Sequence, residues 1–142
     1  LRCYHGLGVV LSDKGDVQGA NEMFQFLLRV NPSDNQGVRL LVFQTLIELG
    51  EYSEAEKVAE KHSDGRESSE CYFRYGFVLM DYLRHKLGAC SKQQLECTLV
   101  RALQNNNFVP QFMLQNEPLP PRPDTISPGG IEEALSYASS SL

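Results

Sequence analysis

The sequence predicts an all-α protein in which about three pairs of helices stack into a helical-repeat solenoid, followed by an extended proline-rich segment and a last helix. Three observations predict this fold. Short stretches recur along the chain at a spacing close to the ~34 residues of a helix-pair repeat. Apolar residues inside each repeat follow helical spacing. The prolines gather in the last third of the chain, where they exclude a central β-strand.

The first predicted helix pair covers residues 1–32. Two helices approach closely only where small residues lie between them, and Gly8 and Ala20 have the spacing for such a contact. The turn falls at Gly15-Asp16, and Pro32 closes the unit because proline does not continue a helix but suits the first turn of the next one. Larger side chains are expected to fill the space around the small ones: Tyr4, Leu7, Leu11 and Phe24.

The second predicted pair covers residues 35–61. The stretch KGDVQGA (14–20) aligns with LGEYSEA (49–55), so that the glycine and the last alanine recur 35 residues later. The first helix of this pair is apolar on more than one face, as expected of a helix packed between neighbours. The pattern departs from the first pair at Arg39 and Phe43, where an aromatic and a small residue would be usual.

The third predicted pair covers residues 69–104. The stretch CYFRYGFVL (71–79) repeats CYHGLGVVL (3–11) with an offset of 68 residues. We expect the first helix to run to about Leu87, with Gly88 as its C-cap. Ser91 is the expected N-cap of a second helix that runs through Gln104. The apolar face of that second helix consists of Leu95, Leu99, Ala102 and Leu103.

Residues 105–130 have a different composition, with six of the seven prolines and the pair Gly129-Gly130. The segment is too apolar for a solvated linker, although a linker is the alternative. We expect it to run extended and to cap the stack by docking on Leu95, Leu99 and Leu103. A short helical turn is expected near 111–114. A last helix is predicted over 131–142, with Glu132 and Glu133 in its first turn, where the helix dipole favours acidic residues.

The repeat units resemble the tetratricopeptide family. Four stretches in this order are similar to one group within it, which includes bacterial repeat proteins and the eukaryotic suppressor of tumorigenicity 7 family: NPSDNQGVRLLV (31–42), NNNFVPQFML (105–114), PLPPRP (118–123) and GGIEEALSYA (129–138). The resemblance covers nearly the whole chain. It departs at Asn107 and Phe108, where that group usually has Pro and His. It implies a helical-repeat scaffold without catalytic residues.

Composition and charge disfavour several other functions. The net charge of −5 and the lack of a Lys/Arg cluster argue against nucleic acid and anionic membrane surfaces as partners. No segment is apolar over the ~18–20 residues that a membrane span needs. The four cysteines form no CxxC pair, and His5, His62 and His85 lie on different elements, so no metal site is expected. Reduced structural thiols indicate an intracellular, cytoplasmic protein.

No nucleophile elbow and no phosphate-binding loop occur, so we expect neither enzymatic activity nor a cofactor. The chain begins and ends inside helical patterns, which suggests a fragment of a longer protein. The predicted function is a protein–protein interaction scaffold that binds a partner protein or peptide in a concave groove. The groove is lined by the first helix of each pair: Arg2, His5, Val9, Leu40, Gln44, Ile47, Phe73, Phe77 and Met80.

Alternatives to groove binding remain at this point. The proline-rich tail, or repeats outside this chain, could cover the groove instead of a partner. The chain could also be a non-catalytic substrate-recognition or regulatory arm of an enzyme whose catalytic part lies elsewhere. A third reading is a structural spacer in a larger assembly.

Overall fold

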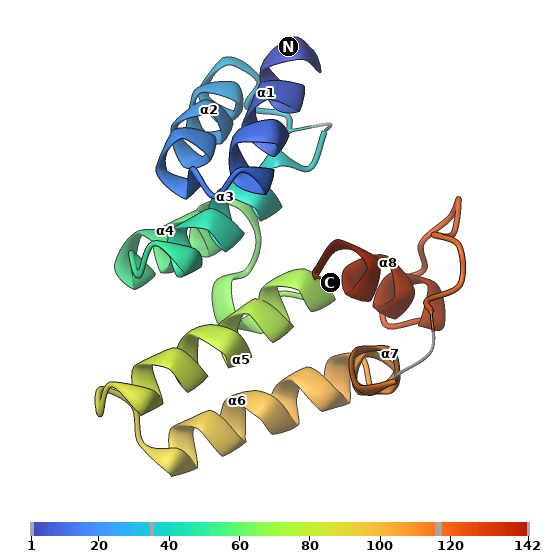
Figure 1. Cartoon of the computed structure of the whole chain (residues 1–142). Helices are drawn as coiled ribbons and strands as arrows, with labels where there is room; N and C mark the ends of the chain where they lie inside the picture. The colour runs from blue at the N-terminus through green and yellow to red at the C-terminus, as the bar shows by residue number, and fades with distance from the viewer. Residues whose placement is uncertain (1, 35, 116–117, 142) are drawn as a thin grey trace. The chain divides into compact units, whose positions relative to one another are not determined.

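A computed structural model describes residues 2–34, 36–115 and 118–141 of the chain (Figure 1). These residues form eight α-helices and one short 3₁₀ turn, and they contain no β-strand, so the predicted all-α class is confirmed. The chain divides into two compact units. We call residues 1–65 the N-terminal unit and residues 66–142 the C-terminal unit.

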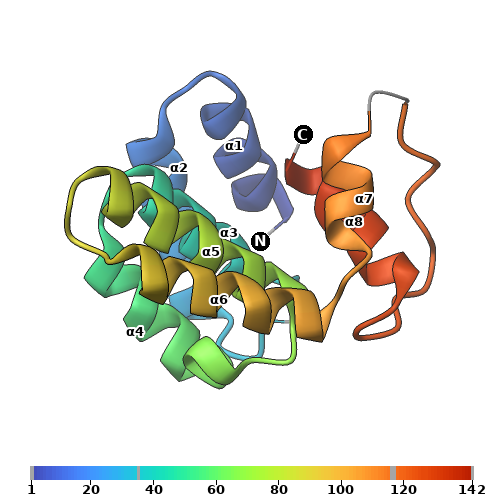
Figure 2. The same ribbon diagram turned by 90° about the horizontal axis from the view of Figure 1, so that it is seen from below.

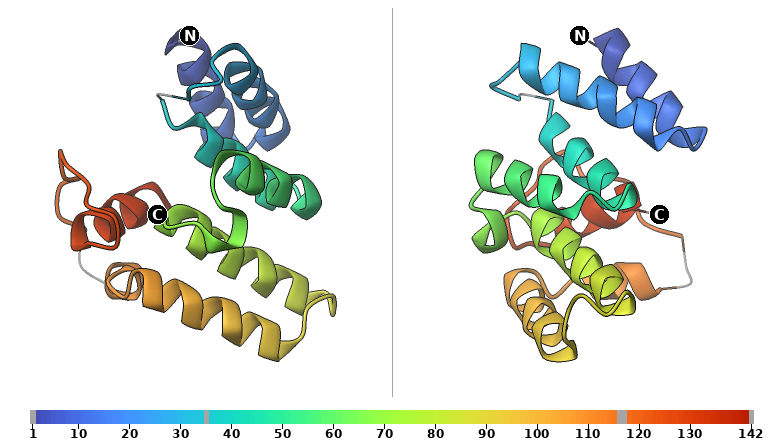
Figure 3. Two further views of the ribbon diagram at one scale, coloured as in Figure 1. Left: turned by 180° about the vertical axis from the view of Figure 1, so that it is seen from behind. Right: turned by 90° about the vertical axis from the view of Figure 1, so that its left-hand side faces the viewer.

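The N-terminal unit consists of two antiparallel helix pairs, and each helix packs on the next one along the chain. Figure 3 shows the two pairs stacked, with the first in blue and the second in teal and green. Four helices make up the unit: α1 (Arg2–Asp13), α2 (Val17–Val30), α3 (Val38–Glu48) and α4 (Tyr52–His62).

The two helices of the first pair meet at Gly8. A Cβ atom on Gly8 would lie 2.5 Å from Cε1 of Phe24, which is closer than carbon atoms can approach, so the ring of Phe24 needs a glycine opposite it. Ala20 on α2 is also fully buried. In the second pair the large residue is on the first helix and the small residue is on the second helix. Phe43 is buried on α3, and the position equivalent to Phe24 carries the small, fully buried Ala59.

The turns inside both pairs rely on equivalent glycines. Gly15 and Gly50 have φ angles of 81° and 77°, in the left-handed region that favours glycine. The carboxylate of Asp16 then caps α2 by accepting a hydrogen bond of 2.9 Å from the backbone N–H of Gly19.

The start of α3 explains why the second pair departs from the repeat pattern at Arg39. The buried carboxylate of Asp34 accepts hydrogen bonds from the backbone N–H groups of Val38 and Arg39, at 2.6 and 3.0 Å. The guanidinium of Arg39 returns to the same carboxylate at 2.9 Å. Arg39 therefore neutralises a buried acid that satisfies the first turn of α3, because nearly every buried polar group needs a partner.

The C-terminal unit begins with a helix pair that follows the 3₁₀ turn Gly65–Glu67. The two helices, α5 (Cys71–Lys86) and α6 (Lys92–Asn105), lie side by side in Figure 2. Gly88 follows the end of α5 with a φ of 76°. The hydroxyl of Ser91 caps α6 by accepting a hydrogen bond from the backbone N–H of Gln94. Both caps were predicted from the sequence.

A buried acid holds α5 to α6. Asp81 is fully buried and accepts two hydrogen bonds from the guanidinium of Arg66, at 2.8 and 3.0 Å. The hydroxyl of Thr98 on α6 donates a third at 2.7 Å. Burial by itself would raise the pKa of Asp81. The hydrogen bonds from Arg66 and Thr98 outweigh it and hold that pKa below its ordinary value, so the side chain is a carboxylate at neutral pH.

The last third of the chain forms two further helices, α7 (Val109–Leu114) and α8 (Ile131–Ser141), which pack on each other. The predicted start of the last helix at Ile131 is confirmed. The segment 105–130 was expected to dock on Leu95, Leu99 and Leu103 of α6, and this expectation is wrong for Leu99, which stays exposed. Leu114 and Ile126 are exposed as well. The apolar core here includes residues of α5, α7 and α8: Cys71, Val109 and Ala134, with Tyr72, Tyr75, Phe108, Phe112, Met113 and Tyr137 packed around them.

A buried glutamate joins these elements. Glu133 of α8 accepts hydrogen bonds from the backbone N–H of Cys71 at 2.9 Å, the backbone N–H of Gly129 at 2.7 Å and the side-chain amide of Asn106 at 3.3 Å. Its carboxylate thus lies at the N-terminus of α5, where the helix dipole favours a negative charge. The acidic start of the last helix, predicted from sequence as a favourable helix N-terminus, therefore also caps a second helix 62 residues earlier in the chain.

Candidate functional site

The groove residues predicted in the N-terminal unit are only partly accessible. On α1, Arg2 and Val9 are exposed and His5 is half-buried. On α3, Leu40 is half-buried and Gln44 is exposed. Ile47 is buried, so it does not offer the apolar surface expected of it.

The aromatic end of the predicted groove is buried. Phe73, Phe77 and Met80 of α5 expose 2% of their surface or less, and the expectation that they lie open to a partner is wrong. Part of the reason is visible at Phe77, whose ring is covered by the guanidinium of Arg66 at 4.6 Å. Helix α5 also contacts both α6 and α8, which leaves it little free surface.

A different apolar surface lies open on the N-terminal unit. Large apolar side chains of α1 and α2 are exposed by a third to a half, and the rings of Tyr4 and Phe26 contact each other with their centroids 5.5 Å apart. We call this surface the α1–α2 apolar face, and it consists of Tyr4, Leu7, Val10, Phe26 and Val30. Clusters of exposed apolar side chains on a folded protein mark interaction sites more often than scattered ones do.

The second helix pair of the same unit shows what surrounds the positions equivalent to this face. With the offset of 35 residues, Leu7 corresponds to Val42 of α3. Leu7 is 47% exposed, whereas Val42 is 1% exposed and α3 packs on α2. The hydroxyl of Thr45, which corresponds to Val10, lies 3.1 Å from the side-chain oxygen of Asn21 on α2. The face that α3 buries against a neighbouring helix is therefore the face that α1 leaves open.

The C-terminal unit repeats this comparison. With the offset of 68 residues, Tyr4 and Leu7 correspond to Tyr72 and Tyr75 of α5. Both rings pack against Tyr137 of α8, with centroids 5.2 and 5.7 Å apart. The hydroxyl of Tyr72 also lies 3.0 Å from the hydroxyls of two serines on α8. A helix thus covers this position on α5 as well as on α3.

Sequence reasoning assigned Tyr4 and Leu7 to the contact between α1 and α2. The structure keeps Phe24 in that contact and leaves Leu7 exposed, whereas Tyr4 contacts Phe26 of α2 with one side of its ring and is otherwise exposed. No local signal separates these roles, because an apolar residue at helical spacing looks the same whether its neighbour is inside or outside the unit. Comparison of equivalent positions in the three pairs is the signal that finds the open face.

The cysteines are placed as packing residues or lie at the surface. Cys71 and Cys90 are buried, and Cys3 and Cys97 are exposed. Burial, followed by the negative charge of Glu133, raises the pKa of the Cys71 thiol far above its ordinary value, so this sulfur is not a nucleophile at neutral pH. Within the described ranges, no three His, Cys, Asp or Glu side chains come together as metal ligands.

The described residues define an all-helical protein of stacked helix pairs with an open apolar face. None of their helices has the length and apolarity needed to cross a membrane. No protein-family model matches the chain, and neither a curated protein nor a solved structure is significantly similar to it.

Proposed function

We propose that this chain is a protein–protein interaction scaffold of the tetratricopeptide-like kind, and that a helix of a partner protein packs on the α1–α2 apolar face. The observation that carries the proposal is the contrast between Leu7 and its equivalents. Val42 is buried where α3 packs between α2 and α4, and Tyr75 packs against Tyr137 of α8. The occupant expected at Leu7 is therefore also a helix, with small or apolar residues on the side that contacts α1.

The strength of such an interaction can be estimated. Covering the exposed half of one large apolar side chain is worth about 1 kcal/mol. Five such side chains supply about 5 kcal/mol, from which the cost of ordering the partner must be subtracted. Contacts of the partner outside the face would add to this free energy. By itself the face therefore suits a weak, reversible contact. We propose no catalytic residue for the chain.

Photocrosslinking tests this function. A photoreactive amino acid is placed at Leu7, on the face, and in a second protein at Lys14, which is exposed in the turn after α1. We expect crosslinked partner peptides from position 7 and none from position 14. A Tyr4→Asp change should remove the position 7 products while the protein stays folded with only a small drop in melting temperature, because Tyr4 is already 48% exposed. Equal products from both positions, or no product at position 7, would contradict the proposal.

A further inference from the structure

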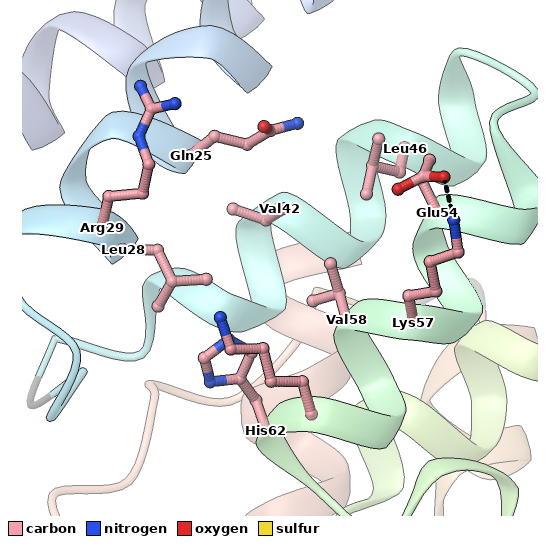
Figure 4. Close-up of a pocket in the computed structure, with 10 residues that line it drawn as sticks. Gln25, Leu28, Arg29, Val42, Leu46, Glu54, Lys57, Val58 and His62 are labelled. Atoms are coloured by element: carbon pink, nitrogen blue, oxygen red, sulfur yellow. Dashed lines mark hydrogen bonds and ion pairs between the residues drawn. The ribbon is translucent and has the colours of Figure 1, made fainter.

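A second surface of the N-terminal unit has a different chemistry from the α1–α2 apolar face. A cleft of about 210 Å³ lies between α2 and α4 above α3, mainly on the side formed by the second helices of the two pairs (Figure 4). The predicted groove, in contrast, was lined by the first helices. Ten residues line the cleft: Gln25, Leu28, Arg29, Val42, Leu46, Glu54, Lys57, Val58, Lys61 and His62.

The floor of the cleft is apolar. Val42 and Leu46 of α3 lie at its base and are themselves buried. Leu28 of α2 and Val58 of α4 face them from the two sides in Figure 4 and are half-buried. A ligand group that enters this floor must be apolar, because a polar group would lose its water without gaining hydrogen bonds.

The rim of the cleft is basic. Arg29 lies on the α2 side, and Lys57 and Lys61 lie on the α4 side, one helical turn apart. One carboxylate, Glu54, opposes these three cations, and it is paired with the Nζ of Lys57 at 2.6 Å. Burial, and then the charge of Lys61, lower the pKa of His62, so its ring is uncharged at neutral pH. The rim thus carries two more positive than negative side chains in a chain whose net charge is −5.

The size of the cleft limits its ligand. Its volume is below the ~300 Å³ at which pockets for drug-sized molecules begin. One large apolar side chain fills such a space, and the neighbouring residues of a peptide would pass along the rim. A bare phosphate would leave the apolar floor empty, and a basic or neutral peptide would not use the cations.

We infer that the α2–α4 cleft binds a short acidic peptide segment, with one apolar side chain on the floor and Asp or Glu residues beside Arg29, Lys57 and Lys61. The match of charge between an acidic segment and a basic rim gives both the preference for this ligand and a faster encounter. The pair between Glu54 and Lys57 is weak because both side chains are more than half exposed, so an incoming carboxylate displaces Glu54 readily.

Binding of a labelled peptide to the whole chain tests this inference by fluorescence anisotropy. The probe is a short peptide with one Leu flanked by Asp and Glu, and its control has Asn and Gln in place of the acids. Charge reversal on the rim, by Lys61→Glu or Arg29→Glu, should weaken binding of the acidic probe about fivefold or more. Glu54→Gln should strengthen binding, because it removes the internal competitor for Lys57.

Two controls make the result decisive. Lys14→Glu makes the same change in net charge outside the cleft, and it should alter the affinity by less than about twofold. High salt should weaken binding of the acidic probe and leave the Asn/Gln peptide unaffected. The inference is overturned if both peptides bind equally, if Lys14→Glu weakens binding as much as Lys61→Glu, or if Glu54→Gln lowers the affinity. The exposed positions of these side chains keep the fold intact in every variant.

Discussion

The two helix pairs of the N-terminal unit follow one plan with opposite choices of side-chain size. In the first pair, a glycine on α1 faces a phenylalanine on α2. In the second pair, 35 residues later, the phenylalanine is on α3 at Phe43 and the small residue is on α4 at Ala59. The two pairs thus place one large and one small residue at the same two repeat positions in opposite order, an exchange that conserves volume as close packing of protein interiors favours.

The pairs also differ in what covers them. Leu7 and Val42 occupy the same position of the repeat, yet one is half exposed and the other is buried. The difference comes from the neighbour, because α2 packs on α3 and leaves the outer face of α1 open. One residue position can thus belong to the core in one copy and to an interaction surface in another.

The largest effect should come from placing a charge at that position in each pair. Val42→Asp puts an unpaired carboxylate into the core and should destabilise the fold by about 3 kcal/mol or more. Leu7→Asp should cost only about 1 kcal/mol, because about half of the side chain already contacts water. Urea denaturation followed by far-UV circular dichroism measures both. Similar losses for the two variants would mean that Leu7 is covered within the chain.

Exchanging the large and the small residue of the first pair tests whether the two positions compensate for each other's volume. Gly8→Phe forces two phenylalanine rings into one contact and should cost about 3 kcal/mol. Adding Phe24→Ala should recover at least half of that loss, because the double variant copies the arrangement at Phe43 and Ala59. Phe24→Ala alone should remain destabilising through the cavity it leaves. The parent protein and the three variants form a double-mutant cycle. If the loss of stability in the double variant equals the sum of the two single losses, the two side chains do not compensate for each other's volume.

Gly6→Phe is the matched control for that cycle. A Cβ atom on Gly6 would meet nothing within 4 Å and the position is exposed, so this change on the same helix should leave stability nearly unaltered.

The smallest effect should distinguish the two aspartate caps. Asp34 uses both oxygens, one for the N–H of Val38 and one for the N–H and guanidinium of Arg39. Asp34→Asn turns an acceptor into a donor and should cost about 1–2 kcal/mol. Asp16 accepts a hydrogen bond from the N–H of Gly19, so Asp16→Asn keeps a good cap and should stay within about 0.5 kcal/mol of the parent. Equal losses in thermal unfolding would show that the second oxygen of Asp34 is dispensable.

The positions of several helix ends were predictable because their causes are local. The hydroxyl of Ser91 reaches the N–H three residues later, and Gly88 takes a φ that other residues avoid. The start of α8 at Ile131 follows from the paired glycines before it and the acids after it. Each signal lies within a few residues of the feature that it predicts, so no knowledge of the fold was needed.

The candidate surfaces were less predictable. Phe73, Phe77 and Met80 have the spacing of a groove face, yet all three are buried. The basic cleft between α2 and α4 combines residues from Gln25 to His62, and no segment of the chain shows this combination by itself. Such sites arise from distances between helices, which residue spacing does not contain.

Residue pattern alone was sufficient for the helical class, the turns at Gly15 and Gly50, and the close approach of the first two helices at Gly8, because each depends on neighbours close in sequence. Packing between distant segments decided the rest. It placed α8 on α5, and it directed the Glu133 carboxylate to the N-terminus of a helix 62 residues away. It also left Leu7 open while burying Val42. The hydrophobic effect rewards burial of any apolar surface without specifying the partner, so the identity of the covering helix follows from three-dimensional fit.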